Sequence, residues 1–373
     1  MTTSNGGPRQ RMNERLRGYD DRRAGWARSI RTRWHALPRP ARWLAILALI
    51  VVLYLLPIIQ PPILTTPDSD FGSVLFDAAL FALVAIGLNV VIGMAGLLDL
   101  GYVGFYAVGA YSVAVFGSPN SSLGTGYPWL VCVPIAIALS MLAGVILGGP
   151  TLRLRGDYLA IVTLGFGEIV RLTAVNSNAL GAAAGITGIP HPPGKRPDGT
   201  DIFSILNINA FYWLALTVIF IVVLGVRNLE NSRVGRSWLA IREDEDAAEL
   251  MGVPTFRFKL WAFAIGAAIG GLSGSLFAGR QGFINPDSFL LQFSILFVAA
   301  VVLGGAGNLL GVVTGAVVIA YLPERFRGFA DYRIFVFGLA LIIVMIFRPQ
   351  GIIPNRRRAT ELAVRTEEVA EGA

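Results

Sequence analysis

The pattern of hydrophobic and polar positions divides the chain into long apolar runs separated by short polar segments. A helix needs about 20 apolar residues to cross the hydrocarbon core of a bilayer, and fewer where surrounding protein shields it. Runs of this kind predict membrane-spanning helices at Trp43–Ile59, Phe71–Gly93, Leu97–Gly117, Pro128–Gly148, Tyr158–Asn176, Phe211–Val226, Lys259–Gly279 and Tyr332–Phe347.

A further apolar run, Leu291–Leu322, is too long for one ordinary span and slightly short for two. It contains Gly304-Gly305-Ala306-Gly307-Asn308, a sequence that favours a break. Two short helices in this run give about ten spans in all, and one tilted helix gives about nine. The predicted fold class is therefore an all-α, polytopic transmembrane helix bundle.

The distribution of basic residues favours the ten-span count and a cytoplasmic location for both termini. With the N-terminus inside, ten spans place 24 of the 31 Lys and Arg residues on the cytoplasmic side, as the positive-inside rule expects. Nine spans would put the basic C-terminal segment outside and would fit the rule slightly worse. Either count places the charged segment 227–258 in the cytoplasm.

These assignments give the expected domain organisation. Residues 1–42 form a cytoplasmic, arginine-rich tail that we expect to be disordered, residues 43–348 form the transmembrane domain, and residues 349–373 form a cytoplasmic C-terminal tail. The N-terminal tail carries eleven arginines. Nucleic-acid binding is one interpretation, but no recognition motif accompanies the charge. Attraction to anionic lipid, worth about 1 kcal/mol per basic residue near the surface, is the favoured one.

Composition supports a lipid environment and excludes several chemistries. Hydrophobic residues make up 54% of the chain and charged residues only 15%, whereas soluble domains carry about 25% charged residues. The single cysteine, Cys132, excludes a disulfide framework, and His35 and His191 are too far apart to form a clustered metal site. No phosphate-binding loop is present, since Gly194-Lys195 is followed by Arg196 rather than Ser or Thr. We expect no catalytic residues, metal or cofactor on this chain.

The most distinctive polar segment is a charged stretch, Arg236–Pro254, between two apolar runs. Its acidic residues Asp244, Glu245 and Asp246 suit the start of a short helix, and Gly252 and Pro254 suit its end. On that helix Ala247, Leu250 and Met251 fall on one face and form an apolar knob. Such a knob in water predicts a docking surface for a soluble partner; a helix folded back on the membrane surface is the alternative.

Polar residues inside the apolar runs are few and are candidates for function. Glu168 and Arg171 are spaced to pair on one helix face, and we interpret them as a structural ion pair. Four residues surround a predicted break between two runs, where backbone would face a polar path: Asn89, Gly93, Gly96 and Asp99. They are the candidate substrate pathway, and a simple helix hairpin is the alternative.

Small residues recur every fourth position in two later helices, which allows close helix packing. One stripe comprises Gly266, Gly270, Gly274 and Ala278, and the other comprises Gly307, Gly311 and Gly315. The turn-rich segment Asn178–Asn209 is the longest external loop. It serves either as a connector or as part of a docking surface for an extracellular partner.

Several motifs together resemble LivM-type permeases of branched-chain amino-acid ABC importers. They run in the family's order from about Phe71 to Gly351, and they include Gly87-Leu-Asn89-Val-Val-Ile-Gly93-Met-Ala-Gly96-Leu-Leu-Asp99, Leu152-Arg-Leu-Arg-Gly-Asp157-Tyr and Phe347-Arg-Pro-Gln-Gly351. The stretch Asp246-Ala247-Ala248-x-x-x-Gly252 resembles the EAA loop of such permeases, with Asp in place of the usual Glu.

This resemblance implies a transport subunit, not an enzyme, in a bacterial plasma membrane. It implies a second, LivH-like permease, two cytoplasmic ATPases that carry ATP and Mg²⁺, and an extracytoplasmic substrate-binding protein. The ATPase-coupling residues would be Arg242, Asp246, Ala247, Ala248, Leu250, Met251 and Gly252. A permease for urea or short amides is an alternative within the same class. Rival classes are a self-contained secondary transporter and an intramembrane enzyme, for which no inverted repeat, proton relay or nucleophile–base pair is evident.

Overall fold

A computed structural model of the chain describes residues 38–62, 64–65, 70–154, 156–195, 201–204 and 207–325, together with 335, 338–339, 342 and 351–353. The chain divides into two units, Met1–Pro61 and Pro62–Ala373. The predictions for the arginine-rich segment before residue 38, for most of Tyr332–Phe347 and for residues 354–373 lie outside the described residues.

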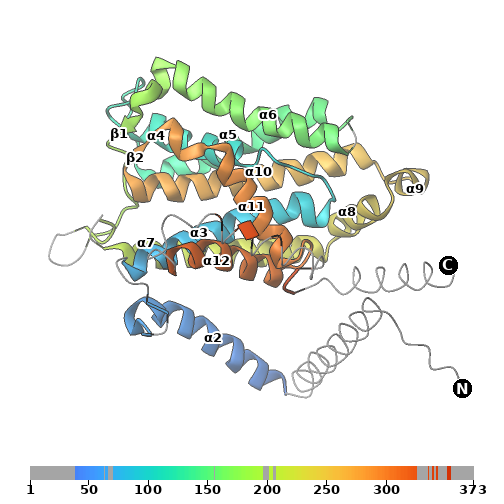
Figure 1. Ribbon diagram of the computed structural model, residues 1–373, viewed down its shortest axis with the longest axis horizontal. Coiled ribbons are helices and arrows are strands. Elements are labelled where there is room, and N and C mark those ends of the chain that lie inside the picture. Colours follow the sequence, from blue (N-terminus) through green and yellow to red (C-terminus); the bar gives the residue numbers. More distant parts are fainter. Residues whose placement is uncertain are drawn as a thin grey trace, which may run out of the picture. The chain divides into compact units, whose positions relative to one another are not determined.

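In the first unit, the apolar run forms helix α2, Arg39–Ile59 (Figure 1). Pro40 suits the first turn of this helix because its backbone has no N–H to leave unsatisfied there. The helix ends where Gln60 adopts a left-handed conformation (φ 40°).

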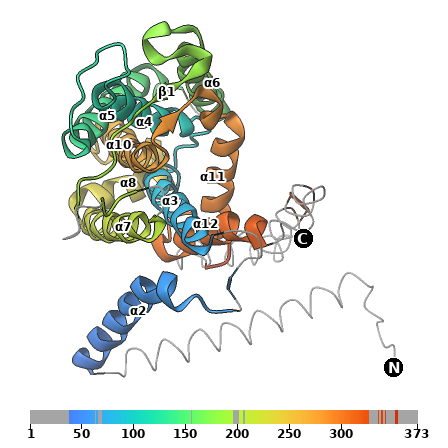
Figure 2. The same ribbon diagram turned by 90° about the vertical axis from the view of Figure 1, so that its left-hand side faces the viewer.

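The second unit is a helix bundle whose membrane-length elements follow the predicted apolar runs. It contains α3 (Phe71–Asn89), α4 (Val103–Gly117), α5 (Trp129–Thr151), α6 (Asp157–Asn176), α7 (Ile208–Glu230), α10 (Thr255–Gln281), α11 (Leu291–Gly304) and α12 (Leu309–Arg325). Six helices of the described residues are long and apolar enough to cross a membrane. Figure 2 looks roughly along α10, which lies in the middle of the bundle and packs on α3, α4 and α5.

Glycines let α10 occupy this central position, as its small-residue stripe predicts. Gly266, Gly270 and Gly274 are all buried. A Cβ atom would collide with Val91 Cγ2 at Gly266 and with the Tyr106 carbonyl oxygen at Gly274, and at Gly270 it would lie only 3.1 Å from Phe105 Cβ. Dispersion contacts between closely approaching backbones hold helices together where the surrounding lipid is as apolar as the helices.

The run Leu291–Leu322 forms two helices, α11 and α12, which separate at Gly304–Asn308 as the glycines predict. Gly311 packs against the backbone of Gly304, and Gly315 against Ala300. The expected stripe is wrong in one member, because Gly307 lies in the turn (φ +87°) and not on the helix. This turn needs glycine because positive φ is strained for other residues.

The predicted span Leu97–Gly117 is wrong at its start, since helix α4 begins only at Val103. The Asp99 carboxylate accepts a hydrogen bond from the Gly101 N–H (2.9 Å), which forms a turn instead of a helix. Gly101 also lies against the backbone of Thr163, so tertiary packing holds the turn in place.

The segment predicted to be the longest external loop, Asn178–Asn209, is tied to the C-terminal end of α10. Strand β1 (Ile186–Thr187) pairs antiparallel with β2 (Phe283–Ile284), and His191 Nδ1 lies 2.6 Å from the Gly279 carbonyl oxygen. His191 is partly buried. In Figure 1, these strands lie at the opposite end of the second unit from the short helices α8 (Arg233–Glu243) and α9 (Glu245–Leu250). Following the topology predicted from the sequence, we call the strand end the outer end and the other the inner end.

Candidate coupling loop and transport cavities

The charged stretch forms two short helices, each capped by its own sequence. Helix α8 (Arg233–Glu243) begins at Ser232, whose hydroxyl accepts hydrogen bonds from Val234 N (3.1 Å) and Gly235 N (3.4 Å). Helix α9 (Glu245–Leu250) begins at Asp244, whose carboxylate accepts from Ala247 N (2.9 Å). The predicted cap signals are confirmed, including the left-handed Gly252 (φ 84°). We call residues 231–254 the coupling loop.

The coupling loop is fixed to the first turn of α10. Trp238 is fully buried, and its Nε1 donates to the Phe258 carbonyl oxygen (2.7 Å). Glu245 of α9 forms an ion pair with Lys259, whose side chain is only 6% exposed. These two contacts join the loop to α10.

The predicted apolar knob is present at the end of α9. Leu250 is 88% exposed and Met251 is 86% exposed, and Ala247 beside them is also exposed. Ala248 is different: it is 5% exposed and faces the chain's own interior. The surface offered to a partner therefore comprises Ala247, Leu250 and Met251, while Ala248 packs the helix onto the loop.

The coupling loop reaches the interior of the bundle through Arg242. The chain after α3 continues as a π-helix, η1 (Val90–Met94), and then turns at Gly96 (φ +74°). The Arg242 guanidinium donates to the Gly93 carbonyl oxygen, and a Cβ atom on Gly96 would lie 2.8 Å from Arg242 Cγ. The predicted break is present, and Arg242 binds directly to it. The sequence predicts a role for Arg242 and a break at Gly93 and Gly96, but it does not predict that the two are in contact.

Asn89 joins this break to the turn between α11 and α12. Its fully buried side chain accepts a hydrogen bond from Gly307 N (2.8 Å). Its Nδ2 has no hydrogen-bond partner within the described part of the chain. The turn is closed on its other side by Ile352 N and Ile353 N, which donate to the Leu303 and Gly304 carbonyl oxygens. The break after α3 and the turn between α11 and α12 thus meet at one place.

Asp99 lies in the turn before α4 rather than at this meeting point. It is fully buried, and Leu100 N beside it donates to Thr163 Oγ1 (3.0 Å). The second Asp99 oxygen, Oδ2, finds no hydrogen-bond partner among the described residues. Its established contacts are those of a turn that anchors α4 to α6.

Two cavities open beside Arg242 at the inner end. The larger, of about 520 Å³, lies between η1 and α8; its lining includes Gly93, Met94, Arg242 and Gly307. The smaller, of about 270 Å³, is bordered by Gly96, Leu97 and Lys259. The structure thus brings Gly93 and Gly96 to the walls of cavities.

Glu168 and Arg171 form the predicted ion pair on α6, with 2.5 Å between Oε1 and Nη2. The two side chains are 37% and 20% exposed. The pairing is confirmed, but it is made within one helix at the surface of this chain.

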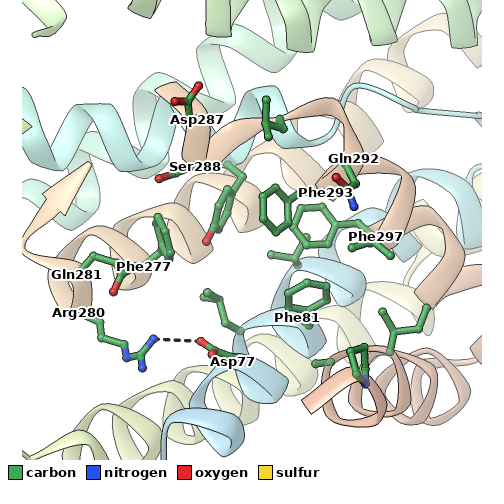
Figure 3. Close-up of a pocket in the computed structure, with 18 of the residues that line it drawn as sticks. Asp77, Phe81, Phe277, Arg280, Gln281, Asp287, Ser288, Gln292, Phe293 and Phe297 are labelled. Atoms are coloured by element: carbon green, nitrogen blue, oxygen red, sulfur yellow. Dashed lines mark hydrogen bonds and ion pairs between the residues drawn. The ribbon is translucent and has the colours of Figure 1, made fainter. Parts of the chain in front are cut away.

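Sequence reasoning missed a larger cavity at the outer end, of about 700 Å³ (Figure 3). Asp77 of α3 and Arg280 of α10 form an ion pair in its wall, with 3.1 Å between Oδ1 and Nη1. Arg280 also stacks over Phe76, with Cζ 4.8 Å from the ring centroid. Two charged residues in the sequence could have indicated this cavity: Asp77 lies inside the apolar run Phe71–Gly93, and Arg280 directly follows the run Lys259–Gly279.

The long apolar helices define a multi-pass membrane protein. Residues 71–345 match the family described as "Branched-chain amino acid transport system / permease component". The chain belongs to this family.

Named relatives agree with this assignment. The chain is 41% identical to the high-affinity branched-chain amino acid transport system permease protein LivM of Salmonella typhimurium, over 76% of this chain and 70% of the relative. It is 39% identical to LivM of Escherichia coli, over 84% and 76% of the two chains. LivH of Escherichia coli is 26% identical, over 73% and 91%. No solved structure matches.

Proposed function

We propose that the chain is a permease subunit of an ABC importer for branched-chain amino acids in a bacterial plasma membrane. Its partners would be a LivH-like permease, two cytoplasmic ATPases that bind ATP and Mg²⁺, and an extracytoplasmic binding protein. The observation that carries the proposal is one loop that presents Leu250 and Met251 to solvent and binds Gly93 through Arg242.

The same observation suggests how the loop transmits work. When the ATPases close, the knob on α9 is displaced. The displacement passes to α10 through Lys259 and Trp238, and to the break in α3 through Arg242. Because Asn89 links that break to Gly307, the break after α3 and the turn between α11 and α12 would move together at the inner cavity.

We also propose the ten-span topology with both termini in the cytoplasm. The separation of α11 from α12, with Gly311 packed against Gly304, supports two short spans in that run. The Arg325 guanidinium donates to Thr65 O (3.2 Å) just before α3, which supports an outer position for the end of α12.

The function is tested by uptake. Cells that lack their own branched-chain amino-acid importers and produce the chain with its partner subunits are expected to accumulate radiolabelled leucine. Unlabelled isoleucine and valine should compete, and urea should not. Competition by urea, with none by isoleucine, would assign the subunit to the short-amide alternative instead.

The docking role of α9 is tested by the double variant Leu250→Asp/Met251→Asp. Two carboxylates in place of a docking knob should lower uptake roughly 30-fold, since an interface hot spot is worth about 2 kcal/mol or more. The ATPases should no longer co-purify with the permease. Leu123→Asp is the matched control, since Leu123 is a similarly exposed apolar residue (55%) in the loop after α4. Normal uptake by the double variant would remove the docking claim.

The pathway is tested with cysteines at Met94 and Leu97, which line the two inner cavities, in a Cys132→Ala background. Both should react with a small water-soluble thiol reagent at rates that change when ATP is added to the assembled importer. A cysteine at Glu168 serves as the control and should react at a rate independent of ATP. Inert cysteines at 94 and 97, together with an ATP-dependent one at 168, would place the route along α6.

A further inference from the structure

The outer cavity combines an ion pair with an aromatic wall. Figure 3 shows Asp77 and Arg280 on one side of the space and Phe81, Phe293 and Phe297 facing it. The volume of about 700 Å³ lies in the range of small-molecule sites, about 300–1,000 Å³. Arg280 is at the opposite end of α10 from the coupling loop, so this cavity is where a solute arriving from outside would be met.

We propose that this cavity binds a zwitterionic amino acid with an apolar side chain before its passage inward. The inference rests on the proposed import function and extends it, because it places substrate recognition in the permease itself. The α-carboxylate would bind Arg280, the α-ammonium would bind Asp77, and the side chain would lie on the phenylalanines.

The charged groups fit the head group of an amino acid. Ionisable residues in a membrane bundle are costly and tend to serve a pathway. A guanidinium has five N–H donors and a carboxylate has about four acceptor sites. While they remain paired with each other, a guanidinium can therefore also bind a carboxylate of a ligand, and a carboxylate can also bind its ammonium. The Asp77 side chain is 48% exposed, and Phe76 holds the guanidinium from the other face.

The aromatic groups fit an apolar side chain. Phe81 and Phe297 make an edge contact with centroids 5.1 Å apart, and Tyr106 contacts both Phe277 (5.5 Å) and Phe297 (6.0 Å). These rings come from α3, α4, α10 and α11, so they form a continuous wall rather than one stripe. A branched aliphatic side chain gains by leaving water for such a wall.

The alternative is that the ion pair only joins α3 to α10. Those helices already pack through Gly87 and Gly266 farther along, and both charged side chains line the cavity. Exchanging the two charges distinguishes these roles. The exchanged residues would still attract each other, so a purely structural ion pair would be preserved. The positions that bind the α-carboxylate and the α-ammonium would be swapped, so leucine binding would be lost.

The first experiment measures leucine uptake by the complete importer. Asp77→Asn and Arg280→Gln should each raise the KM for leucine about tenfold or more, as expected for the loss of a charge-assisted hydrogen bond. The exchanged variant Asp77→Arg/Arg280→Asp should reach wild-type amounts in the membrane and still fail to restore the KM. Restoration of a wild-type KM by the exchange would overturn the proposal and leave a structural pair.

The second experiment locates the ligand directly. A diazirine analogue of leucine, photolysed with the purified importer, should label peptides that line the cavity, namely residues 277–297 and the segments around Phe81 and Tyr106. Excess leucine should prevent labelling; leucinol, which lacks the carboxylate, and 4-methylpentanoate, which lacks the amine, should not. Labelling elsewhere, or equal competition by leucinol, would contradict the site. If the wild-type importer takes up no leucine at all, the proposed function fails; if uptake is normal and every variant retains its KM, only this site fails.

Discussion

Replacement of Gly274 by leucine is expected to remove the folded permease from the membrane. A Cβ atom at this position would collide with the Tyr106 carbonyl oxygen and would lie 2.8 Å from Ala110 N, both backbone atoms of α4. Backbone atoms cannot relieve a clash by a change of rotamer, as a flexible side chain can, so α10 and α4 would have to move apart. Overpacking of a core by side chains alone costs about 1–3 kcal/mol, against a total stability of about 5–15 kcal/mol.

The measurement is the amount of monodisperse permease extracted from membranes. Gly225→Leu is the matched control. Gly225 lies in a long apolar helix, α7, and a Cβ atom at this position would have no neighbouring atom within 4 Å. The control should accumulate like the unaltered chain. Equal amounts of the two variants would show that the contact between α10 and α4 does not limit folding.

Replacement of Arg242 by alanine is expected to abolish most transport while leaving the permease assembled. The guanidinium is the group that connects the coupling loop to Gly93, and its alkyl stem packs on Gly96. Loss of a hydrogen bond from a charged group costs about 1.5–3 kcal/mol, so uptake should fall roughly 10- to 100-fold. ATP hydrolysis by the docked ATPases should continue and should no longer respond to substrate.

Arg233→Ala is the control for this variant, since it removes an exposed arginine from the same helix. It should transport normally. If Arg242→Ala retains substrate-stimulated hydrolysis and uptake, the contact with Gly93 is not the path of coupling, and the links through Lys259 and Trp238 become the better explanation.

The features that were predictable from sequence depend on local chemistry. Apolar runs specify helices wherever they occur in a bilayer, because backbone groups there must bond within their own segment. The caps of α9 were equally readable, since Asp244 and Gly252 act on residues within a turn of themselves.

The features that were missed depend on which elements meet in space. The late start of α4 follows from the packing of Gly101 on α6. The inward orientation of Ala248 follows from the loop it covers. The outer cavity requires α3, α10, α11 and α12 to surround one space, and Asp77 and Arg280 are brought together by that arrangement alone. Spacing along the chain carries no information about such contacts.

Helix α10 is attached at both of its ends. Its first turn is bound by Trp238 and Glu245, and its last turn by Asp77 and His191. In the importer that we propose, α10 therefore joins the nucleotide-binding partners at one end to the amino-acid site at the other, and thermodynamic linkage between two such sites is reciprocal. Any factor by which bound nucleotide alters the affinity of the amino-acid site is then the factor by which the amino acid alters the affinity for nucleotide.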